Sequence, residues 1–125
     1  MVRIVEAPAG KRAVLKQMNG VILTDYLGRK VRFTTERRQH ILKYHPEMRE
    51  WVARVREVLA QPDRVVRSRS DPETELFYVW QTQTRVGPKY LCVVVVVKDS
   101  DAFILTAYLT DIIKKGAVLW PKNDE

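Results

Sequence analysis

The sequence is poor in the residues that build disulfide bonds and metal sites. It has one cysteine, Cys92, and two histidines, His40 and His45, among 125 residues. One cysteine cannot form an internal disulfide, and a separation of five residues turns a helix through about 140°, so the histidines do not share one helix face. We therefore expect no metal site and no cofactor, and we expect Cys92 to pack as a small apolar side chain.

Long apolar runs are also missing. The longest run, residues 91–97, is too short to cross a bilayer, and the first eight residues lack the apolar segment of a signal peptide. We therefore expect a cytoplasmic protein with no membrane contact. Hydrophobic residues make up 46% and charged residues 30% of the chain, which is the composition of a folded domain and not of a disordered segment.

Acidic residues are outnumbered by basic ones. Lysine and arginine total 22 against 15 aspartates and glutamates, giving a formal net charge of +7. A surplus of this size favours polyanionic partners, nucleic acid first among them. A basic surface also serves solubility, so the charge alone leaves both interpretations open.

Turn residues divide the chain into an N-terminal part with helices and a C-terminal part with strands. Residues 1–20 show no clear period and are expected to form an irregular arm before one domain at residues 21–120. Apolar runs on both sides of Leu27 and Gly28 predict a short hairpin. Thr34 or Thr35 can cap a helix over residues 36–44, and apolar residues at three- and four-residue steps predict a second helix over residues 48–59.

Four strand-like runs follow, at residues 64–70, 75–83, 89–98 and 102–110. Their short, turn-rich links predict antiparallel pairing. The third run is apolar at successive positions, so both of its faces should be buried and it should lie centrally. In the fourth run, strict alternation turns Leu105 toward the core and Thr106 and Tyr108 away from it. Residues 111–115 are compatible with a last helical turn. The predicted fold is α+β, with an N-terminal hairpin and two helices packed on a four-stranded antiparallel sheet.

Several side chains are suited to chemistry at a phosphodiester. His40 and His45 can exchange protons near neutral pH, although a structural histidine at a helix end is the commoner case. Arg67 and Arg69 are two apart on a strand and share a face, so their guanidinium groups can hold a phosphate or form a solvated surface. Thr106 and Tyr108 likewise share a face as hydroxyl donors.

Other side chains are candidates for binding. The ring of Tyr78 can stack on a base or pack in the core. Lys98 and Lys114 place positive charge near strand ends, where a solvated role is the default.

The order of several short strings resembles a known nuclease family. The strings are residues 28–34, the stretch His40 to Glu47 with its His-Pro-Glu, Gln61-Pro62-Asp63, Arg67-Ser68-Arg69 and Thr106-Ala107-Tyr108. Over roughly residues 22 to 120 they are similar to the phage-associated branch of the barnase, EndoU, colicin and RelE (BECR) nuclease group. This resemblance implies helices packed on an antiparallel sheet of about four strands, an RNA-cleaving site on the sheet face and no required metal.

Carried over residue by residue, the resemblance implies His40, His45, Arg67, Thr106 and Tyr108 as catalytic candidates, without a complete matched set. The sequence-based hypothesis is a metal-independent endoribonuclease of the bacterial toxin type. One imidazole removes the 2′-hydroxyl proton, Arg67 with Arg69 stabilises the phosphoryl oxygens, and Tyr108 or the other histidine protonates the leaving oxygen. The alternative is a non-catalytic RNA- or protein-binding module. RNA and an antitoxin or immunity protein are the expected partners, and a homodimer is left open.

Overall fold

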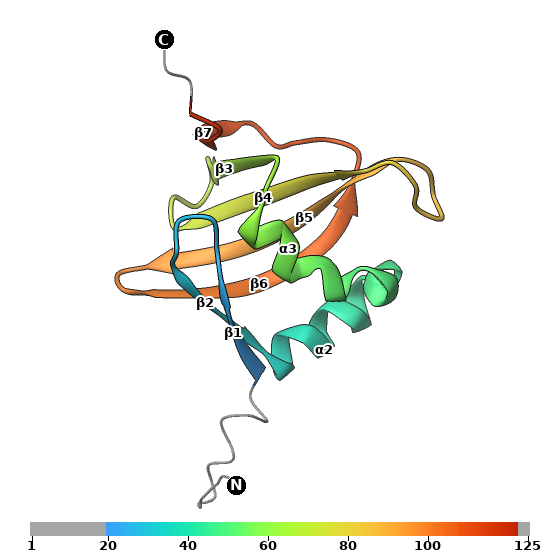
Figure 1. Cartoon of the computed structure of the whole chain (residues 1–125), viewed down its shortest axis with the longest axis horizontal. Coiled ribbons are helices and arrows are strands. Elements are labelled where there is room, and N and C mark those ends of the chain that lie inside the picture. Colours follow the sequence, from blue (N-terminus) through green and yellow to red (C-terminus); the bar gives the residue numbers. More distant parts are fainter. Residues whose placement is uncertain (1–19, 123–125) are drawn as a thin grey trace, which may run out of the picture.

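A seven-stranded mixed sheet organises the chain. The computed structural model describes residues 20–122, so the arm expected at residues 1–20 lies almost wholly outside the described residues. The strands lie side by side in the order β1-β2-β6-β5-β4-β3-β7 (Figure 1). The strands are β1 (Gly20–Thr24), β2 (Lys30–Thr34), β3 (Arg64–Ser68), β4 (Thr74–Gln81), β5 (Lys89–Lys98), β6 (Asp101–Thr110) and β7 (Gly116–Trp120), and the helical segments are α2 (Thr35–Tyr44), α3 (Val55–Ala60) and the 3-10 turns η1 (Pro46–Glu50) and η2 (Val52–Arg54).

This architecture corrects the predicted four-stranded antiparallel sheet. The four expected runs are present as β3 to β6, and they pair antiparallel in sequence order. The hairpin β1–β2 does not pack on that sheet but extends it, because β2 pairs parallel with β6 where Arg32 faces Phe103. At the opposite edge β7 pairs with β3. The expected last helical turn at residues 111–115 is instead a link without regular structure.

The helical part is shorter than predicted. Helix α2 agrees with the expected helix, and Thr34 caps it, since its Oγ1 accepts a hydrogen bond from the Arg37 backbone N–H at 3.1 Å. Pro46 prevents the helix from continuing and begins η1. The apolar stripe expected to form one second helix is divided among η1, η2 and the six-residue α3. Only the second predicted helix is therefore shortened, because α2 has the expected length.

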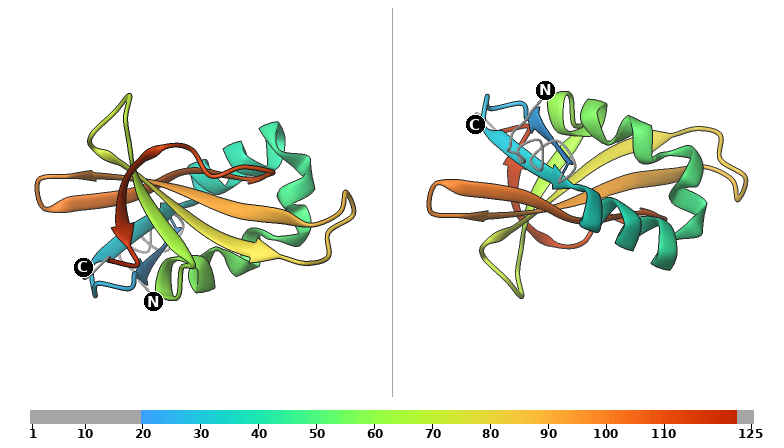
Figure 2. Two further views of the ribbon diagram at one scale, coloured as in Figure 1. Left: turned by 90° about the horizontal axis from the view of Figure 1, so that it is seen from above. Right: turned by 90° about the horizontal axis from the view of Figure 1, so that it is seen from below.

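Strand β5 is the centre of the core, as its composition predicted. Leu91 to Val95 are all buried, with alternate side chains facing opposite sides of the sheet. Figure 2 shows α3 over one face and the link between β6 and β7 crossing the other. The core on the α3 face includes Val31, Phe33, Ile41, Met48, Val55, Leu59, Val65, Phe77, Leu91, Val93, Val95, Ile104 and Ala107.

The opposite face, which we call the second face, carries a smaller apolar cluster. Val66, Leu76, Tyr78, Cys92 and Val94 form it, and Ile113 of the β6–β7 link packs against it. Cys92 is buried, as expected for a small apolar side chain, and burial raises the pKa of its thiol to about 12. The thiol is therefore protonated and unreactive at neutral pH.

A bulge in β6 changes which of its side chains face the core. Val94 pairs with Thr106 but Val95 pairs with Ile104, so Leu105 is an extra residue without a partner in β5. Ile104 and Ala107 then both face the α3 side, and Leu105, predicted to lie in the core, is 36% exposed. The bulge corrects that prediction and leaves Thr106 on the second face opposite Val94.

A buried ion triad joins the β1–β2 turn to the sheet. Arg29 donates from Nε to Oδ2 of Asp25 at 2.7 Å and from its two terminal nitrogens to Glu75 at 3.2 and 2.8 Å. The Asp25 side chain is 0% and that of Glu75 6% exposed. Oδ1 of Asp25 also accepts the backbone N–H groups of Leu27 and Arg29, which closes the turn. Two buried carboxylates are thus satisfied by one guanidinium, whose side chain is 28% exposed.

We expect Arg29→Ala to lower the free energy of unfolding by about 3 kcal/mol, because it leaves two buried carboxylates without their counter-charge. Urea denaturation measures the change. Arg32→Ala is the matched control, since the ion pair of Arg32 with Asp101 has side chains 45% and 56% exposed and should contribute at most about 1 kcal/mol. Equal losses in the two variants would contradict a special role for the triad.

Within residues 20–122, no helix is long and apolar enough to cross a membrane.

Candidate functional site

Helix α2 lies along the edge of β6 that β2 leaves unpaired. β2 and β6 share one register pair, Arg32 with Phe103, and beyond it α2 contacts β6. Arg37 fixes this arrangement, since its Nε donates a hydrogen bond to the carbonyl oxygen of Leu105, the bulge residue, at 3.0 Å. We call this place, where α2 and the turn after it meet residues 105–108, the α2–β6 site.

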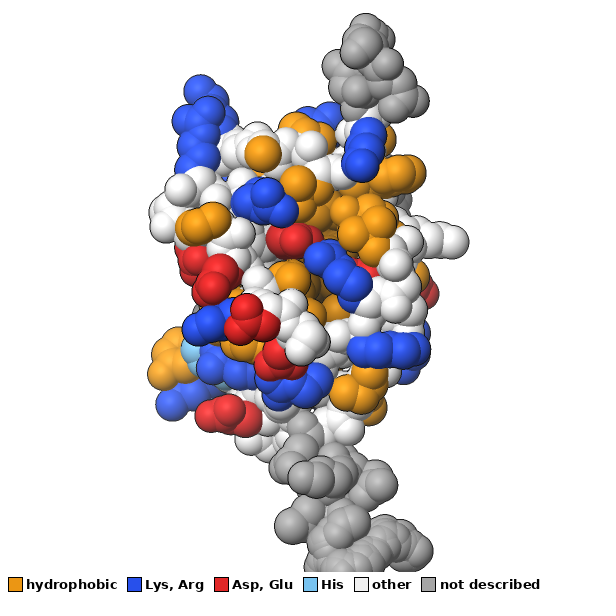
Figure 3. All heavy atoms as spheres, turned by 90° about the vertical axis from the view of Figure 1, so that its left-hand side faces the viewer, with side chains coloured by type: hydrophobic (Ala, Val, Ile, Leu, Met, Phe, Trp, Pro, Cys, Tyr) orange, Lys and Arg blue, Asp and Glu red, His pale blue; other side chains and the backbone are white. Residues whose placement is uncertain are grey.

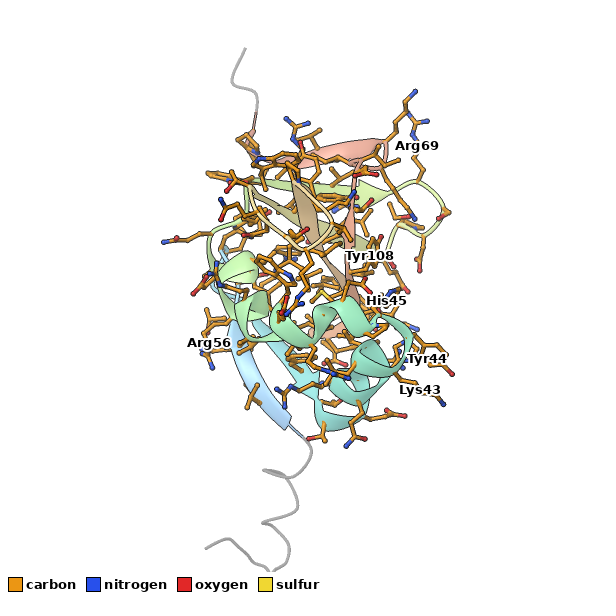
Figure 4. All side chains as sticks on the ribbon, turned by 90° about the vertical axis from the view of Figure 1, so that its right-hand side faces the viewer. Lys43, Tyr44, His45, Arg56, Arg69 and Tyr108 are labelled. Atoms are coloured by element: carbon orange, nitrogen blue, oxygen red, sulfur yellow. The ribbon has the colours of Figure 1, made fainter. Side chains whose placement is uncertain are left out.

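His45 is the best-placed titratable group of the site. It follows α2 directly, and its backbone N–H donates to the carbonyl of Ile41 at 2.7 Å. Its ring lies 5.6 Å from the ring of Tyr108, centroid to centroid, and Figure 4 shows the two residues side by side. Nδ1 lies 3.8 Å from Oε2 of Glu47, and the His45 side chain is 34% exposed. An imidazole held between a carboxylate and an aromatic ring, and still reachable from solvent, suits proton transfer.

Glu47 was not among the residues singled out from the sequence. It lies two residues after His45, across Pro46, so the turn η1 brings its carboxylate back to the imidazole. A carboxylate at this position can pair with the protonated ring and orient it. A His-x-Glu spacing at the end of a predicted helix is the signal that would have suggested the pair.

His40 lies on α2, just before His45 in the chain. Its ring is 4.8 Å from that of Tyr44. Partial burial lowers the pKa of His40 below its ordinary value of 6.5, and the charges of Arg37 and His45 lower this pKa further. His40 is therefore neutral and able to accept a proton at neutral pH. The influence of His45 also means that the two imidazoles are close enough to interact electrostatically.

Arg37 is the guanidinium group that the sequence reasoning missed. It precedes His40 by three residues, which places both side chains on one side of α2. Only its Nε is engaged, and its two terminal nitrogens make no hydrogen bond with another of the described residues. A guanidinium anchored through Nε presents its remaining donors in a fixed orientation, which suits a phosphate. The three-residue spacing to a histidine was the available signal.

The two predicted hydroxyl donors are both at the site, but burial limits what each can do. Burial is the main cause that raises the pKa of Tyr108, and Cys92, its partner in the β5–β6 register, raises this pKa further. Tyr108 therefore supports the His45 ring instead of acting as an acid. The Thr106 Oγ1 is buried and has no hydrogen-bond partner among the described residues. A ligand reaches it only after neighbouring side chains move.

Arg67 does not join the histidines. Val65 and Arg67 face the α3 side of the sheet, and Arg67 lines a hollow with Tyr26, Arg29 and Glu75. His45 contacts Tyr108 on β6, three strands away from β3, or about 14 Å along the sheet. One phosphate cannot contact both Arg67 and His45 in this structure, which corrects the mechanism predicted from the sequence.

The predicted binding residues are also dispersed. Tyr78 is fully buried, and its hydroxyl accepts the Lys114 backbone N–H at 3.0 Å, so its ring has no free face for a base. Lys98 pairs in register with Asp101 at the far end of β5. The charge of Lys114 acts on Cys92, which places Lys114 near the second face. Arg69 follows β3 and lies on the same side of the molecule as Tyr108 but nearer the β7 edge (Figure 4).

The α2–β6 site thus offers acid–base and anion-binding groups. In residues 20–122 no three histidine, cysteine, aspartate or glutamate side chains gather as metal ligands. Two imidazoles, a carboxylate and a guanidinium are the groups that proton transfer at a phosphodiester requires.

We expect Thr106→Val to leave the free energy of unfolding unchanged within about 0.5 kcal/mol, or to raise it, because no hydrogen bond is lost and an unsatisfied buried group is removed. Thr74→Val is the matched control. Oγ1 of Thr74 donates to Oδ2 of Asp71 at 2.9 Å, so this variant should lose about 1 kcal/mol. Urea denaturation compares the two, and a similar loss in Thr106→Val would show that its hydroxyl has a partner in the folded chain.

We expect His40 to titrate below pH 6.5 and Arg37→Gln to raise its pKa, because the variant removes one of the positive charges that disfavour the imidazolium. A proton NMR titration of the imidazole resonances measures both values. Arg56→Gln is the control, since Arg56 lies on the other side of the molecule from His45 (Figure 4). A titration midpoint at or above 6.5 in the unaltered protein contradicts the expectation.

Comparison with protein-family models, curated proteins and solved structures finds no match to this chain. The resemblance to the BECR nuclease group stays a prediction. The α2–β6 site is therefore interpreted from its own geometry.

Proposed function

We propose that the protein is a metal-independent endoribonuclease that cleaves RNA at the α2–β6 site by attack of a ribose 2′-hydroxyl on the adjacent phosphate. The observation that carries the proposal is the position of His45 between the Glu47 carboxylate and the Tyr108 ring. His40 and Arg37 on the same helix supply a second proton-transfer group and an anion-binding group.

The proposed mechanism uses the two imidazoles in turn. Neutral His40 removes the proton from the 2′-hydroxyl, and O2′ forms a bond to phosphorus. The bond from phosphorus to O5′ breaks, and protonated His45, paired with Glu47, gives its proton to the leaving O5′. The products are a 2′,3′-cyclic phosphate and a free 5′-hydroxyl. At the end of the step His40 carries the proton from the 2′-hydroxyl and His45 has lost its own, and proton exchange with solvent restores both.

In this proposal Arg37, and not Arg67, stabilises the phosphoryl oxygens. Arg37 has free terminal nitrogens beside the β6 bulge, and its charge acts on His40. A guanidinium there can hold phosphoryl oxygens next to the imidazoles. The net charge of +7 supports attraction of an RNA chain toward the site. Since the nucleophile is a 2′-hydroxyl, DNA should not be cleaved.

A second candidate function is an RNA-binding module that does not cleave. It is favoured by the hydroxyl groups of the site, because burial raises the pKa of Tyr108 and the hydroxyl of Thr106 is covered. Such a module would bind RNA in a salt-dependent manner and release no product. An acidic antitoxin or immunity protein and a homodimer stay predictions in both cases.

We expect His45→Ala to reduce the rate of RNA cleavage by about 100-fold or more, which is the usual contribution of a general acid or base. A labelled single-stranded RNA and its DNA counterpart are incubated with protein in excess chelator, and products are separated by size and tested for the cyclic phosphate. His40→Ala and Arg37→Ala should each slow cleavage, and Glu47→Gln should slow it less than His45→Ala.

Arg56→Ala is the matched control, because it removes the same charge as Arg37→Ala on the other side of the molecule from His45 (Figure 4). It should cleave at the rate of the unaltered protein. Cleavage that stops in chelator, or that is as fast in His45→Ala as in the unaltered protein, would rule out the mechanism. RNA binding without product would favour the second candidate.

A further inference from the structure

A hollow lies on the α3 side of the sheet, away from the α2–β6 site. It has a volume of about 560 Å³ and is lined by Tyr26, Leu27, Arg29, Arg67, Trp120 and Lys122, among others. The β1–β2 turn, β3 and the end of β7 enclose it. Figure 3 views the side of the molecule on which these segments meet, where hydrophobic side chains surround a depression edged by basic and acidic groups.

The charges at this hollow leave one guanidinium without a counter-ion. Arg29 is fully engaged by Asp25 and Glu75. Arg67 faces Glu75 in the β3–β4 register, yet it forms no ion pair with any residue in the range 20–122, because Glu75 already holds Arg29. Lys122 is equally unpaired within that range. An anion entering the hollow would meet Arg67 and Lys122, two cations without an ion-pair partner among residues 20–122.

An aromatic ring lies beside these cations. Trp120 is 42% exposed although its position is fixed, because its Nε1–H donates to the Pro62 carbonyl at 3.2 Å and Tyr26 packs at 5.6 Å from it, ring to ring. A fixed, half-exposed indole ring is a stacking surface for a planar group. The hollow therefore combines a surface for a flat ring with donors for an anion.

We propose that this hollow binds a nucleotide, with the base against Trp120 and the phosphate on Arg67, assisted by Lys122. Base stacking on an aromatic ring together with a guanidinium on phosphate is the chemistry by which proteins bind single-stranded nucleic acid. The volume accommodates one nucleotide. This binding does not depend on the proposed cleavage, because the hollow and His45 lie on different parts of the sheet and use different residues. The nucleotide can be free or part of an RNA strand.

The indole N–H resonance of Trp120 reports on the proposed contact. We expect adenosine monophosphate to shift this resonance in a nitrogen–proton NMR spectrum and to leave those of Trp51 and Trp80 unchanged. Arg67→Ala should weaken binding about tenfold or more. Arg64→Ala is the matched control, because it lies on the same strand, three residues earlier, and does not line the hollow. Adenosine without phosphate should bind much more weakly than the monophosphate.

The outcomes distinguish a free nucleotide from an RNA strand as the ligand, and they also test the site itself. Binding of both the monophosphate and a short single-stranded RNA, weakened by Arg67→Ala, supports a site for any nucleotide, and binding of the RNA alone supports a site for a strand. If no probe moves the Trp120 resonance, or if Arg64→Ala and Arg67→Ala weaken binding equally, the proposal is overturned. Adenosine monophosphate contains no internucleotide bond, so its binding can be measured whether or not the protein cleaves RNA.

Discussion

The burial of β5 on both faces is the constraint on which the rest of the structure depends. Leu91 to Val95 present apolar side chains to both sides, and each side must be covered for the sheet to be stable in water. The helical segments cover one face. The link between β6 and β7 crosses the other, and its Lys114 backbone N–H satisfies the Tyr78 hydroxyl. To cross that face the chain must leave β6 at one side of the sheet and return as β7 beside β3.

The same constraint explains where the α2–β6 site and the hollow at Arg67 arise. Helix α2 buries Ile41 in the α3-side core and contacts β6, and its polar side chains stay accessible at the β6 edge. The bulge leaves the backbone carbonyl of Leu105 available there, and Arg37 Nε donates a hydrogen bond to it. At the β3–β7 edge, the β1–β2 turn approaches the end of β7, since the rings of Tyr26 and Trp120 are 5.6 Å apart, and the hollow at Arg67 lies beside this contact.

Local patterns predicted the local structure well. The cap at Thr34, the stop at Pro46, the four antiparallel runs and the buried centre of β5 follow from capping chemistry, proline geometry and apolar content within short windows. The parallel pairing of Arg32 with Phe103 joins segments about seventy residues apart in the numbering, and no local pattern encodes it. β7 was missed because Gly116–Trp120 is too short to show a period and is mostly exposed.

Some residues of the candidate site could be singled out from the sequence and others only from the structure, and the reason is physical. His40 and His45 were singled out from the sequence because histidine is rare here and its side chain ordinarily titrates near neutral pH. Arg37 and Glu47 are common surface types that become informative only through what they contact. Arg67 was predicted to hold a phosphate beside the histidines, but the register places it on the α3 side of β3, three strands from β6. Residue type indicates what a side chain can do and not which face of the sheet it lies on. The bulge at Leu105 shows the same limit, since one extra residue reverses the facing of every side chain before it in β6. The register of the sheet therefore separates the cationic groups at the α2–β6 site from Arg67. A strand of RNA that contacted both would have to pass around an edge of the sheet.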